Sequence, residues 1–308
     1  MRAVALGGGH GLAASLQALR RLTKEVTAIV TVADDGGSSG RLRTELNALP
    51  PGDLRMALTA LAGDDEWGRT WEALLQHRFA SEGPLDGHAV GNLLLVGLAE
   101  VTGDPVKALD LAARLLGIDG RVLPMTTERI EIVAEVAGLL ASNETVEIRG
   151  QVEVATTAGL VCAVTLDPPE PEATPDAVEA IHAADWVVLG PGSLFTSMVP
   201  HLLVPGLRDA IASTSARRLL VLNLVPQTGE TSGFTPAAHL EAVAAHVPDL
   251  PFDHVLADSG TLDRDGLMDA AESLGAAVRF APVRADGHAA RHDPARLARA
   301  YADLMGIV

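Results

Sequence analysis

Residues 1–40, MRAVALGGGHGLAASLQALRRLTKEVTAIVTVADDGGSSG, contain the pattern that decides the fold. A short apolar run at 3–6 meets a glycine-rich turn at 7–11, and leucines at helical spacing follow the turn. A second apolar run, Val26–Val32, is rich in β-branched residues. Strand, helix and strand within about thirty residues indicate a βαβ unit, which requires a parallel sheet with a right-handed crossover.

The C-terminal part of the chain repeats this alternation. Helical patterns dominate from about 41 to 118, and buried-strand runs recur at Trp186–Leu189, Leu219–Val225 and Phe252–Ala257. We therefore predict an α/β fold in a single domain over residues 1–308. Its centre would be one doubly wound, mostly parallel Rossmann-like sheet with helices on both faces.

A different pattern separates the two halves of the chain, at approximately 122–167. Apolar and polar residues alternate at Val146–Ile148 and Gln151–Val154, and a further apolar run covers Leu160–Leu166. Alternation with a period of two is typical of antiparallel strands. We expect a small antiparallel β-rich insertion within the α/β domain. Cys162 is the single cysteine, lies in the last run and is expected to be inert core.

The composition excludes several protein classes. Among 308 residues, 23 Lys plus Arg oppose 40 Asp plus Glu, so the formal net charge is −17, and 48% of the residues are apolar. The apolar content excludes intrinsic disorder, and the acidity argues against nucleic acid and anionic membranes as partners. Because there is neither an apolar run of about 18 residues nor a signal-peptide pattern, we expect a cytoplasmic protein with no membrane span. Neither of the two lysines follows a glycine, which excludes a Walker A loop.

The glycine-rich turn at 7–11 predicts an anion site. It lies where the first strand passes into the first helix, so unpaired N–H groups and the helix dipole face a ligand there. Glycine lets a phosphate approach the backbone closely, and His10 could donate a hydrogen bond to it. The candidates are Gly8, Gly9, His10 and Gly11, with a tight turn alone as the alternative. Leu12 stands where the dinucleotide-binding fingerprint has its third glycine. NAD-dependent hydride transfer is therefore only a third hypothesis, well behind the two functions given below.

Polar side chains follow the second predicted strand. Asp34 and Asp35 lie at its carboxyl end, where open α/β sheets bind ligands, and Ser38, Ser39 and Arg41 come just after. Adjacent carboxylates can hold Mg²⁺ or ribose hydroxyls, while the serine hydroxyls and the guanidinium can contact phosphate oxygens. A capped, glycine-flexed loop with a solvated arginine is the alternative.

Two further segments carry candidate side chains within helical sequence. Asp53 is predicted as the N-cap of a helix that starts at Leu54, and a metal or substrate ligand is the equal alternative. Arg55, in the first turn, opposes the helix dipole, which is a weak sign of function. His88 and Asn92 share one helical face as candidate ligands, with satisfied packing in the core as the alternative.

A second glycine-containing turn, at 190–193, again follows a buried strand and precedes a helix. Its N–H groups and hydroxyls predict a second anion site, with a capped turn as the alternative. The candidates there are Gly190, Pro191, Gly192, Ser193 and Thr196. Near the C-terminus, Arg291 is a further ligand candidate within Arg291-His292-Asp293, a motif whose composition alone favours a solvated charged turn.

Taken together, these motifs resemble the gluconeogenesis factor family, the YvcK-like proteins. The resemblance rests on the Gly-Gly-Gly-x-Gly turn, on the string VTVADDGGSSGRLR at 30–43 and on Pro51-Gly52-Asp53-Leu54-Arg55. Further motifs extend it almost from end to end: Gly87-His88, Gly91-Asn92-Leu93, Gly190-Pro191-Gly192-Ser193-Leu194 and Arg291-His292-Asp293.

The resemblance implies a CofD-like fold, related to the 2-phospho-L-lactate transferases of deazaflavin coenzyme biosynthesis. It implies a cytoplasmic regulator that binds nucleotide sugars such as UDP-N-acetylglucosamine and supports cell shape and cell-wall synthesis on gluconeogenic carbon sources. The alternative is a transferase that moves a phospholactate-type group onto a deazaflavin precursor, and Mg²⁺ is the one cofactor that this activity would need. In either case we expect a homo-oligomer, most simply a dimer.

The expected site joins both glycine turns with the acidic and basic residues between them. Its ligand-binding residues would be Gly8, Gly9, His10, Gly11, Asp34, Asp35, Ser38, Ser39, Arg41, Arg55, His88, Asn92, Gly190, Pro191, Gly192, Ser193, Thr196 and Arg291. The metal ligands, and the catalytic candidates if there is turnover, would be Asp34, Asp35 and Asp53.

Overall fold

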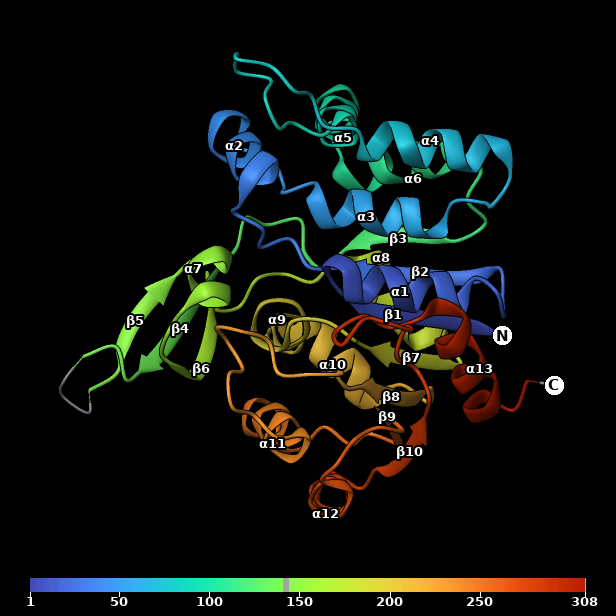
Figure 1. Ribbon diagram of the computed structural model, residues 1–308. Coiled ribbons are helices and arrows are strands. Elements are labelled where there is room, and N and C mark those ends of the chain that lie inside the picture. Colours follow the sequence, from blue (N-terminus) through green and yellow to red (C-terminus); the bar gives the residue numbers. More distant parts are fainter. Residues whose placement is uncertain (141–143, 308) are drawn as a thin grey trace.

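A parallel sheet of seven strands forms the centre of the computed structural model, which describes residues 1–140 and 144–307 (Figure 1). Its strand order is β10-β9-β8-β7-β1-β2-β3, and all neighbouring strands are parallel. The strands are β1 (Arg2–Gly7), β2 (Glu25–Val30), β3 (Arg121–Pro124), β7 (Trp186–Leu189), β8 (Arg217–Val221), β9 (His254–Asp258) and β10 (Ala277–Ala281). The prediction of a doubly wound parallel sheet is confirmed.

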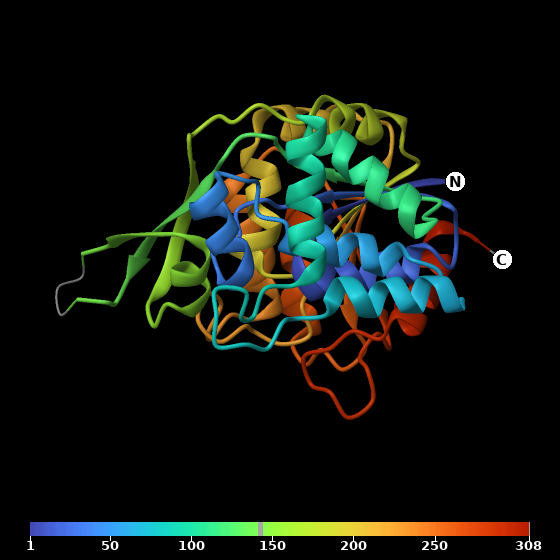
Figure 2. The same ribbon diagram turned by 90° about the horizontal axis from the view of Figure 1, so that it is seen from above.

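Helices cover both faces of this sheet, as the right-handed crossover rule requires. On one face α1 (Gly9–Leu19) packs between α3 (Gly52–Leu61) and α13 (Pro294–Met305), and on the other α8 (Pro175–Ala183) packs against α10 (Pro205–Ser213) (Figure 2). The remaining helices are α2 (Gly37–Leu46), α4 (Glu66–Gln76), α5 (Val90–Thr102), α6 (Pro105–Leu116), the π-helical η1 (Leu194–Met198), α9 (Val199–Leu203), α11 (Pro236–His246) and α12 (Arg264–Ser273). Within residues 1–140 and 144–307, none of the helices has the length and apolarity needed to cross a membrane.

The sheet is buried on both faces, which explains its continuous apolar runs. Residues 3–6 of β1 are at most 2% exposed. One polar contact fixes the C-terminal helix to this core: the hydroxyls of Tyr301 on α13 and Ser15 on α1 lie 2.9 Å apart, and both side chains are fully buried. The last helix of the chain is therefore locked against the first.

The strand order reverses at β1, which is the switch point of the sheet. The chain proceeds from β1 to β2 and β3 on one side, whereas β7 to β10 extend on the other side. Because Leu6 of β1 pairs with Leu189 of β7, both glycine turns leave the sheet at the same place. In open α/β sheets, ligands bind at this point.

The two glycine turns pack directly against each other. A Cβ atom at Gly11 would lie 2.6 Å from the carbonyl carbon of Pro191 and 2.7 Å from Cα of Gly192. Both neighbours are backbone atoms, which cannot move aside without moving the loop. Glycine at position 11 is therefore required by the approach of the two turns.

A three-stranded antiparallel sheet, β5-β4-β6, protrudes from the body (Figure 1). It consists of β4 (Glu131–Ala137), β5 (Val146–Arg149) and β6 (Leu160–Asp167), which confirms the small antiparallel sheet. The insertion was predicted to begin at about residue 122. Residues 122–124, however, belong to β3 and pair with β2 in the parallel sheet. The strand predicted at Gln151–Val154 is wrong, because these residues start helix α7 (Gln151–Thr156). Four alternating residues fit either structure, and Gly150, at φ 96°, turns the chain into the helix.

The placement of Cys162 in the core is also wrong. Its thiol is exposed, because β6 has only one face against the body and residue 162 lies on the other face. The apolar run around it concealed a strand with alternating exposure.

We predict that Gly11→Ala destabilises the fold by about 1–3 kcal/mol, since the added methyl meets backbone on two sides. Urea unfolding at pH 7 measures the change. Gly97→Ala on α5 is the matched control, because no atom lies within 4 Å of its new Cβ and alanine is the better helix former. A Gly11 variant as stable as the Gly97 variant would contradict the tight contact between the turns.

Candidate functional site

The second glycine turn uses its own backbone donors inside the protein. The Gly190 N–H donates to the carbonyl of Leu6 at 3.0 Å. Asn223, just after β8, clamps Gly192 from both sides: its Oδ1 accepts from the Gly192 N–H at 3.1 Å and its Nδ2 donates to the Gly192 carbonyl at 2.7 Å. Pro191 has no N–H. The turn therefore supports Gly11. No backbone N–H of residues 190–192 is left to bind a ligand.

Glu230 is a buried residue of this region that no sequence pattern indicated as part of a site. Its Oε1 accepts a hydrogen bond from Ser193 Oγ at 2.5 Å, and Ser193 also contacts Thr196 Oγ1. Its other carboxyl oxygen, Oε2, is buried with no hydrogen-bond partner among the described residues, and burial raises the pKa of the carboxyl. Glu230 thus holds Ser193 at the start of η1, and no spacing in the sequence signals that role.

Asp53 lies in the first turn of α3, not at its N-cap, and its carboxylate reaches the N-terminus of α1. Helix α3 begins at Gly52, its N-cap is Pro51, and no side chain caps it. The Asp53 carboxylate instead accepts a hydrogen bond from the Gly9 N–H, so the predicted cap is wrong. Burial, reinforced by the neighbouring Asp34 carboxylate, raises the pKa of Asp53 to about 7.

The three predicted metal ligands are divided between two places. Asp34 stays beside Asp53, and its Oδ1 accepts from the Gly36 N–H at 3.0 Å. Asp35 points to the insertion, where its Oδ1 accepts from the Val152 N–H of α7 at 3.0 Å. Among residues 1–140 and 144–307, no group of three or more His, Cys, Asp and Glu side chains is placed to hold a metal ion. A pair of acids, Asp34 and Asp53, is what the geometry brings together.

Four predicted residues form one buried hydrogen-bonded chain: Ser38 on α2, Arg55 on α3, Asn92 on α5 and His88 in the loop just before α5. The prediction that His88 and Asn92 share a helical face is wrong, because α5 begins only at Val90. Arg55 Nη1 donates to Asn92 Oδ1 at 2.9 Å, Asn92 Nδ2 donates to Ser38 Oγ at 3.0 Å, and Ser38 Oγ lies 2.9 Å from His88 Nδ1. All four side chains are at most 4% exposed. The guanidinium can only donate, so it fixes the orientation of the Asn92 amide, and Ser38 is left to donate its hydroxyl proton to His88. The chain therefore joins α2, α3 and the start of α5 into one rigid unit.

Ser39 and Arg41 also contact protein groups. Ser39 Oγ accepts from the Gly52 N–H at 3.0 Å, which ties the start of α2 to the start of α3. Arg41 donates to the carbonyls of Pro84 at 3.1 Å and Asp86 at 2.5 Å. Both side chains hold neighbouring segments in place.

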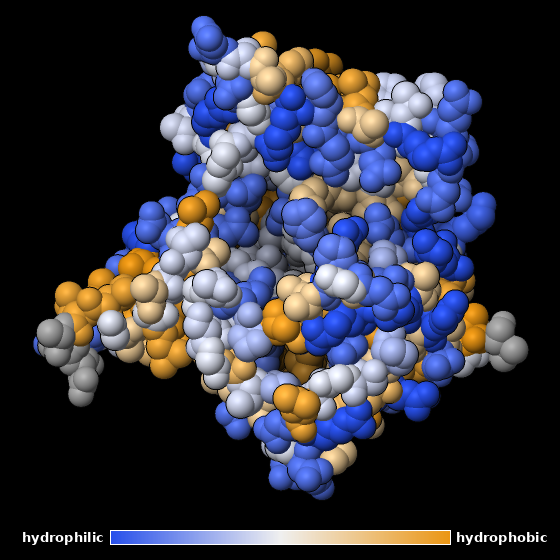
Figure 3. Space-filling model, viewed as in Figure 1, coloured by the Kyte–Doolittle hydropathy of each residue, from blue (hydrophilic) through white to orange (hydrophobic). Residues whose placement is uncertain are grey.

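A cleft of about 740 Å³ opens beside the N-terminus of α1. It runs between α3 and α4 above and α1 with the segment before α13 below, and Figure 3 shows the furrow on this face. Its charged and imidazole side chains are His10, Arg55, Glu72, Arg78, Arg291 and His292. Three arginines against one glutamate make it cationic in an otherwise acidic chain.

The cleft has features that suit a phosphate. The first turn of α1 contains no acidic residue of its own, and the one carboxylate at its N-terminus, that of Asp53, has a pKa raised to about 7, so the positive end of the helix dipole is only partly neutralised at pH 7. Arg55 is 4% exposed, and its Nε has no hydrogen-bond partner among the described residues. A buried donor without a partner is uncommon and points to a missing acceptor.

Comparison with known proteins identifies the protein family of this chain. The family model described as 2-phospho-L-lactate transferase CofD matches residues 3–300. This chain belongs to the CofD family. It is 56% identical over 300 residues to the putative gluconeogenesis factor of Mycobacterium tuberculosis, covering 96% of this chain and 87% of the relative. It is 41% identical over 243 residues to the gluconeogenesis factor of Halalkalibacterium halodurans, covering 79% and 73%.

Solved structures show the same relationship. The crystal structure of a UPF0052-family protein from Bacillus halodurans superposes with a TM-score of 0.86 at 34% identity, and the match covers 97% of both chains. The resemblance to the gluconeogenesis factors and the CofD-like fold are both confirmed.

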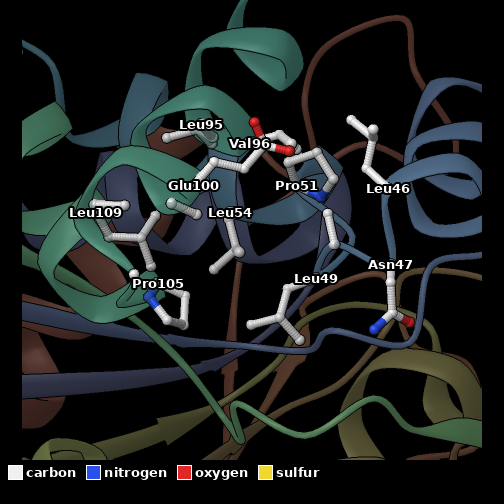
Figure 4. A pocket seen from close by; sticks show the side chains of 14 residues that line it. Leu46, Asn47, Leu49, Pro51, Leu54, Leu95, Val96, Glu100, Pro105 and Leu109 are labelled. Atoms are coloured by element: carbon white, nitrogen blue, oxygen red, sulfur yellow. The ribbon is translucent and has the colours of Figure 1, made fainter.

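This CofD-family chain also has an apolar cavity of about 320 Å³, lined by residues of α3, α5 and α6 (Figure 4). Leu54 of α3 and Leu95 of α5 line it together with the loop that follows α2. Glu100 is its one charged side chain. Apolar walls and a single carboxylate do not suit a phosphate, so the cationic cleft is the candidate ligand site.

The raised pKa of Asp53 predicts a pH-dependent effect of Asp53→Asn. Well below pH 3.8 the carboxyl is protonated whether or not the chain is folded, so it does not change the stability there. Between the ordinary value of 3.8 and the folded value of about 7, stability falls as pH rises, because the folded state disfavours ionisation. We expect Asp53→Asn to stabilise the fold above pH 7 by up to about 4 kcal/mol, and little at pH 4.

Thermal and urea unfolding between pH 4 and pH 8 measure this difference. Asp249→Asn, at an exposed position, is the control and should not change with pH in this way. A constant difference between Asp53→Asn and the unaltered chain would mean that the carboxyl ionises normally.

The buried hydrogen-bonded chain predicts strong coupling between its members. Asn92→Ala removes the acceptor of a buried guanidinium and should cost about 3 kcal/mol, whereas Ser38→Ala should cost about 1 kcal/mol. The double variant should lose less than the sum, by at least about 0.5 kcal/mol. Urea unfolding of the four proteins tests this, and strict additivity would show that the residues act independently.

Proposed function

We propose that this chain is a cytoplasmic regulator that binds a nucleotide sugar of the UDP-N-acetylglucosamine type in the cationic cleft. The supporting observation is the concentration of Arg55, Arg78 and Arg291 around 740 Å³ of open volume in a chain with net charge −17. That volume lies within the range of ligand pockets, about 300–1,000 Å³. Relatives named gluconeogenesis factors support a regulatory role in carbon metabolism.

The diphosphate would lie at the mouth of the cleft, beside His10 and Gly11. There it would meet the positive end of α1, the unpartnered Arg55 Nε and the exposed guanidinium of Arg291. Charge-assisted hydrogen bonds of this kind are about twice as strong as neutral ones. The second glycine turn would hold Gly11 in place without touching the phosphates itself.

A role in cell shape and cell-wall synthesis follows if the ligand is a wall precursor, since its binding would then report precursor supply. The cell-level test is growth and morphology of a deletion strain on gluconeogenic and glycolytic carbon sources. A homodimer is part of the same proposal, and light scattering of the purified chain tests it.

A Mg²⁺-dependent phospholactate-type transferase is the second candidate function, and the acid pair Asp34 and Asp53 favours it. Mg²⁺ usually takes one or two protein carboxylates and completes its shell with phosphates and water, so this pair fits the ion, whereas Asp35 does not. Bound there, Mg²⁺ would neutralise ligand phosphates. The chain itself would contribute the arginines of the cleft, which orient and balance the anionic donor.

Isothermal titration calorimetry and thermal shift distinguish these functions. We expect UDP-N-acetylglucosamine to bind without Mg²⁺ and, at 100 times its Kd, to stabilise the fold by about 2.7 kcal/mol. GDP that binds only with Mg²⁺, with loss of that binding in Asp53→Asn, would favour the transferase. No stabilisation by either nucleotide would contradict both proposals.

We predict that Arg291→Ala weakens UDP-N-acetylglucosamine binding by about 10–100-fold, because a charge-assisted hydrogen bond contributes about 1.5–3 kcal/mol. Arg299→Ala is the matched control, since Arg299 is exposed on α13 and does not line the cleft. The control should bind like the unaltered chain. Equal affinities for the two variants would remove Arg291 from the site.

A further inference from the structure

The strand β5 has an open edge in the part of the chain that the structure describes. The three-stranded antiparallel sheet and α7 form an arm within residues 131–167, and β5 is the outer strand of that sheet, paired with β4 on one side (Figure 1). Its other side faces away from the sheet. An open strand edge presents unpaired N–H and C=O groups, which makes it a template for a strand of another molecule.

The hydrogen-bond pattern shows which residues of β5 face the open edge. The Gly150 N–H donates to the carbonyl of Ile132, the residue opposite, at 2.8 Å. Because hydrogen-bonded and non-hydrogen-bonded pairs alternate along an antiparallel ladder, the backbone of Ile148 is also bonded to β4. The backbone N–H and C=O groups of Glu147 and Arg149 point the other way. Four backbone groups therefore face the open edge.

The helix that follows β5 leaves this edge accessible. Gly150, at φ 96°, turns the chain into α7, which returns to the body, where Gln151 Nε2 donates to the carbonyl of Thr196 at 3.4 Å. The side chains of Glu147 and Arg149 are 61% and 43% exposed. Figures 1 and 2 both show the arm projecting from the body, so two arms can meet while the bodies stay apart.

We propose that two copies of this chain pair through β5, antiparallel about a two-fold axis at Ile148, and so form one continuous six-stranded sheet. The inference rests on the homodimer that is part of the proposed function, and it adds the interface. It does not depend on which ligand the cleft binds.

The sequence of β5 is complementary to itself about this axis. Glu147 of each copy lies opposite Arg149 of the other, and both pairs fall at hydrogen-bonded positions, because the backbone groups of these residues face the edge. The pairing therefore forms four backbone hydrogen bonds and two pairs of opposite charge, which stabilise directly opposed strands. At the axis the half-buried side chain of Ile148 meets its own copy, an apolar contact.

The charges within one arm favour a second copy. Arg149 is shared among three carboxylates, those of Glu131, Glu147 and Asp167. Its contact with Glu147 is the longest of the three, at 3.3 Å. Glu147 is thus the acid that its own arm neutralises least, and the pairing places a second guanidinium directly opposite it. Since the paired strands are short, the buried area is small, and we expect a weak dimer with a micromolar Kd.

An exchange of charges between two variants tests the interface, with the dimer Kd measured by sedimentation velocity over a series of concentrations. Glu147→Arg places arginine opposite arginine in both pairs and should raise the Kd at least about 10-fold. Arg149→Glu places glutamate opposite glutamate and should do the same. An equimolar mixture of the two variants restores both opposite-charge pairs and should dimerise about as well as the unaltered chain. A defect in the folding of one chain would not be repaired by mixing.

Glu147→Pro tests the backbone bonds independently. The N–H of residue 147 points away from β4, so proline is compatible with the ladder inside the arm, as it is on edge strands in general. It removes two of the four bonds between the copies and should also raise the Kd at least about 10-fold. Glu135→Arg is the matched control, because Glu135 is exposed on the central strand β4 and its charge lies away from the edge. Its Kd should equal that of the unaltered chain.

The outcomes separate the interface from the rest of the proposed function. A dimer whose Kd is unchanged in Glu147→Arg and Glu147→Pro, or variants that fold but do not dimerise when mixed, would overturn the inference and leave the homodimer standing. A chain that is monomeric at every concentration would overturn both, whereas ligand binding to the cleft is decided separately by calorimetry. Circular dichroism checks that each variant folds. If Arg149→Glu does not fold, the two variants of Glu147 decide the question.

Discussion

The contact between the two glycine turns is the constraint on which the rest of this structure depends. Gly11 approaches Pro191 backbone to backbone, and that approach is possible only because position 11 has no side chain. It joins the turn after β1 to the turn after β7, which are nearly two hundred residues apart in the chain and neighbours at the switch point. Asn223 and Glu230 hold the second turn from below, so the first turn rests on a fixed base. The start of α1 is thereby presented to the cleft in one orientation.

Electrostatics divides the edge of the sheet into two regions. The acid pair Asp34 and Asp53 lies on one side of the α1 N-terminus, and the raised pKa of Asp53 measures how unfavourable two carboxylates are there. The arginines line the cleft, and Arg55 among them is close enough to Asp34 and Asp53 for both carboxylates to oppose the lowering of its pKa by burial. An anionic ligand is thus drawn toward the arginines and away from the acids unless a cation or a proton intervenes. The regulator and the transferase proposals differ in which side the phosphates occupy.

The sequence was sufficient to predict the fold because its strongest signals are local. Apolar runs followed by glycine turns predicted β1, β2 and β7, and their parallel pairing followed from the crossovers between them. Segments of four or five residues were harder: Gln151–Val154 alternates like a strand but begins a helix, and the run around Cys162 hides an exposed face. In both segments a tertiary neighbour decides the outcome, and no local pattern reveals that neighbour.

The candidate site could be predicted in part. Ser38, Arg55, His88 and Asn92 were singled out separately, and the structure joins them in one chain of hydrogen bonds. What the sequence could not show is which polar groups are already satisfied. Arg41 and Asp35 look like ligand residues, yet each is occupied by the backbone of another segment. The reverse holds for His292, whose motif resembles a solvated turn but contains a buried nitrogen without a partner.

The bond from the Val152 amide to Asp35 has a consequence for how this family can diverge. The second acid of the Asp34-Asp35 pair accepts a hydrogen bond from α7 in the protruding arm, residues 131–167, so the acid and the arm are structurally coupled. A relative whose arm was deleted would lose the amide that Asp35 needs and would keep an unneutralised acid next to Asp34. The arm and the acid at position 35 would then be lost together. The length of the arm would predict which residue stands at position 35, more than a hundred residues earlier in the chain than Val152.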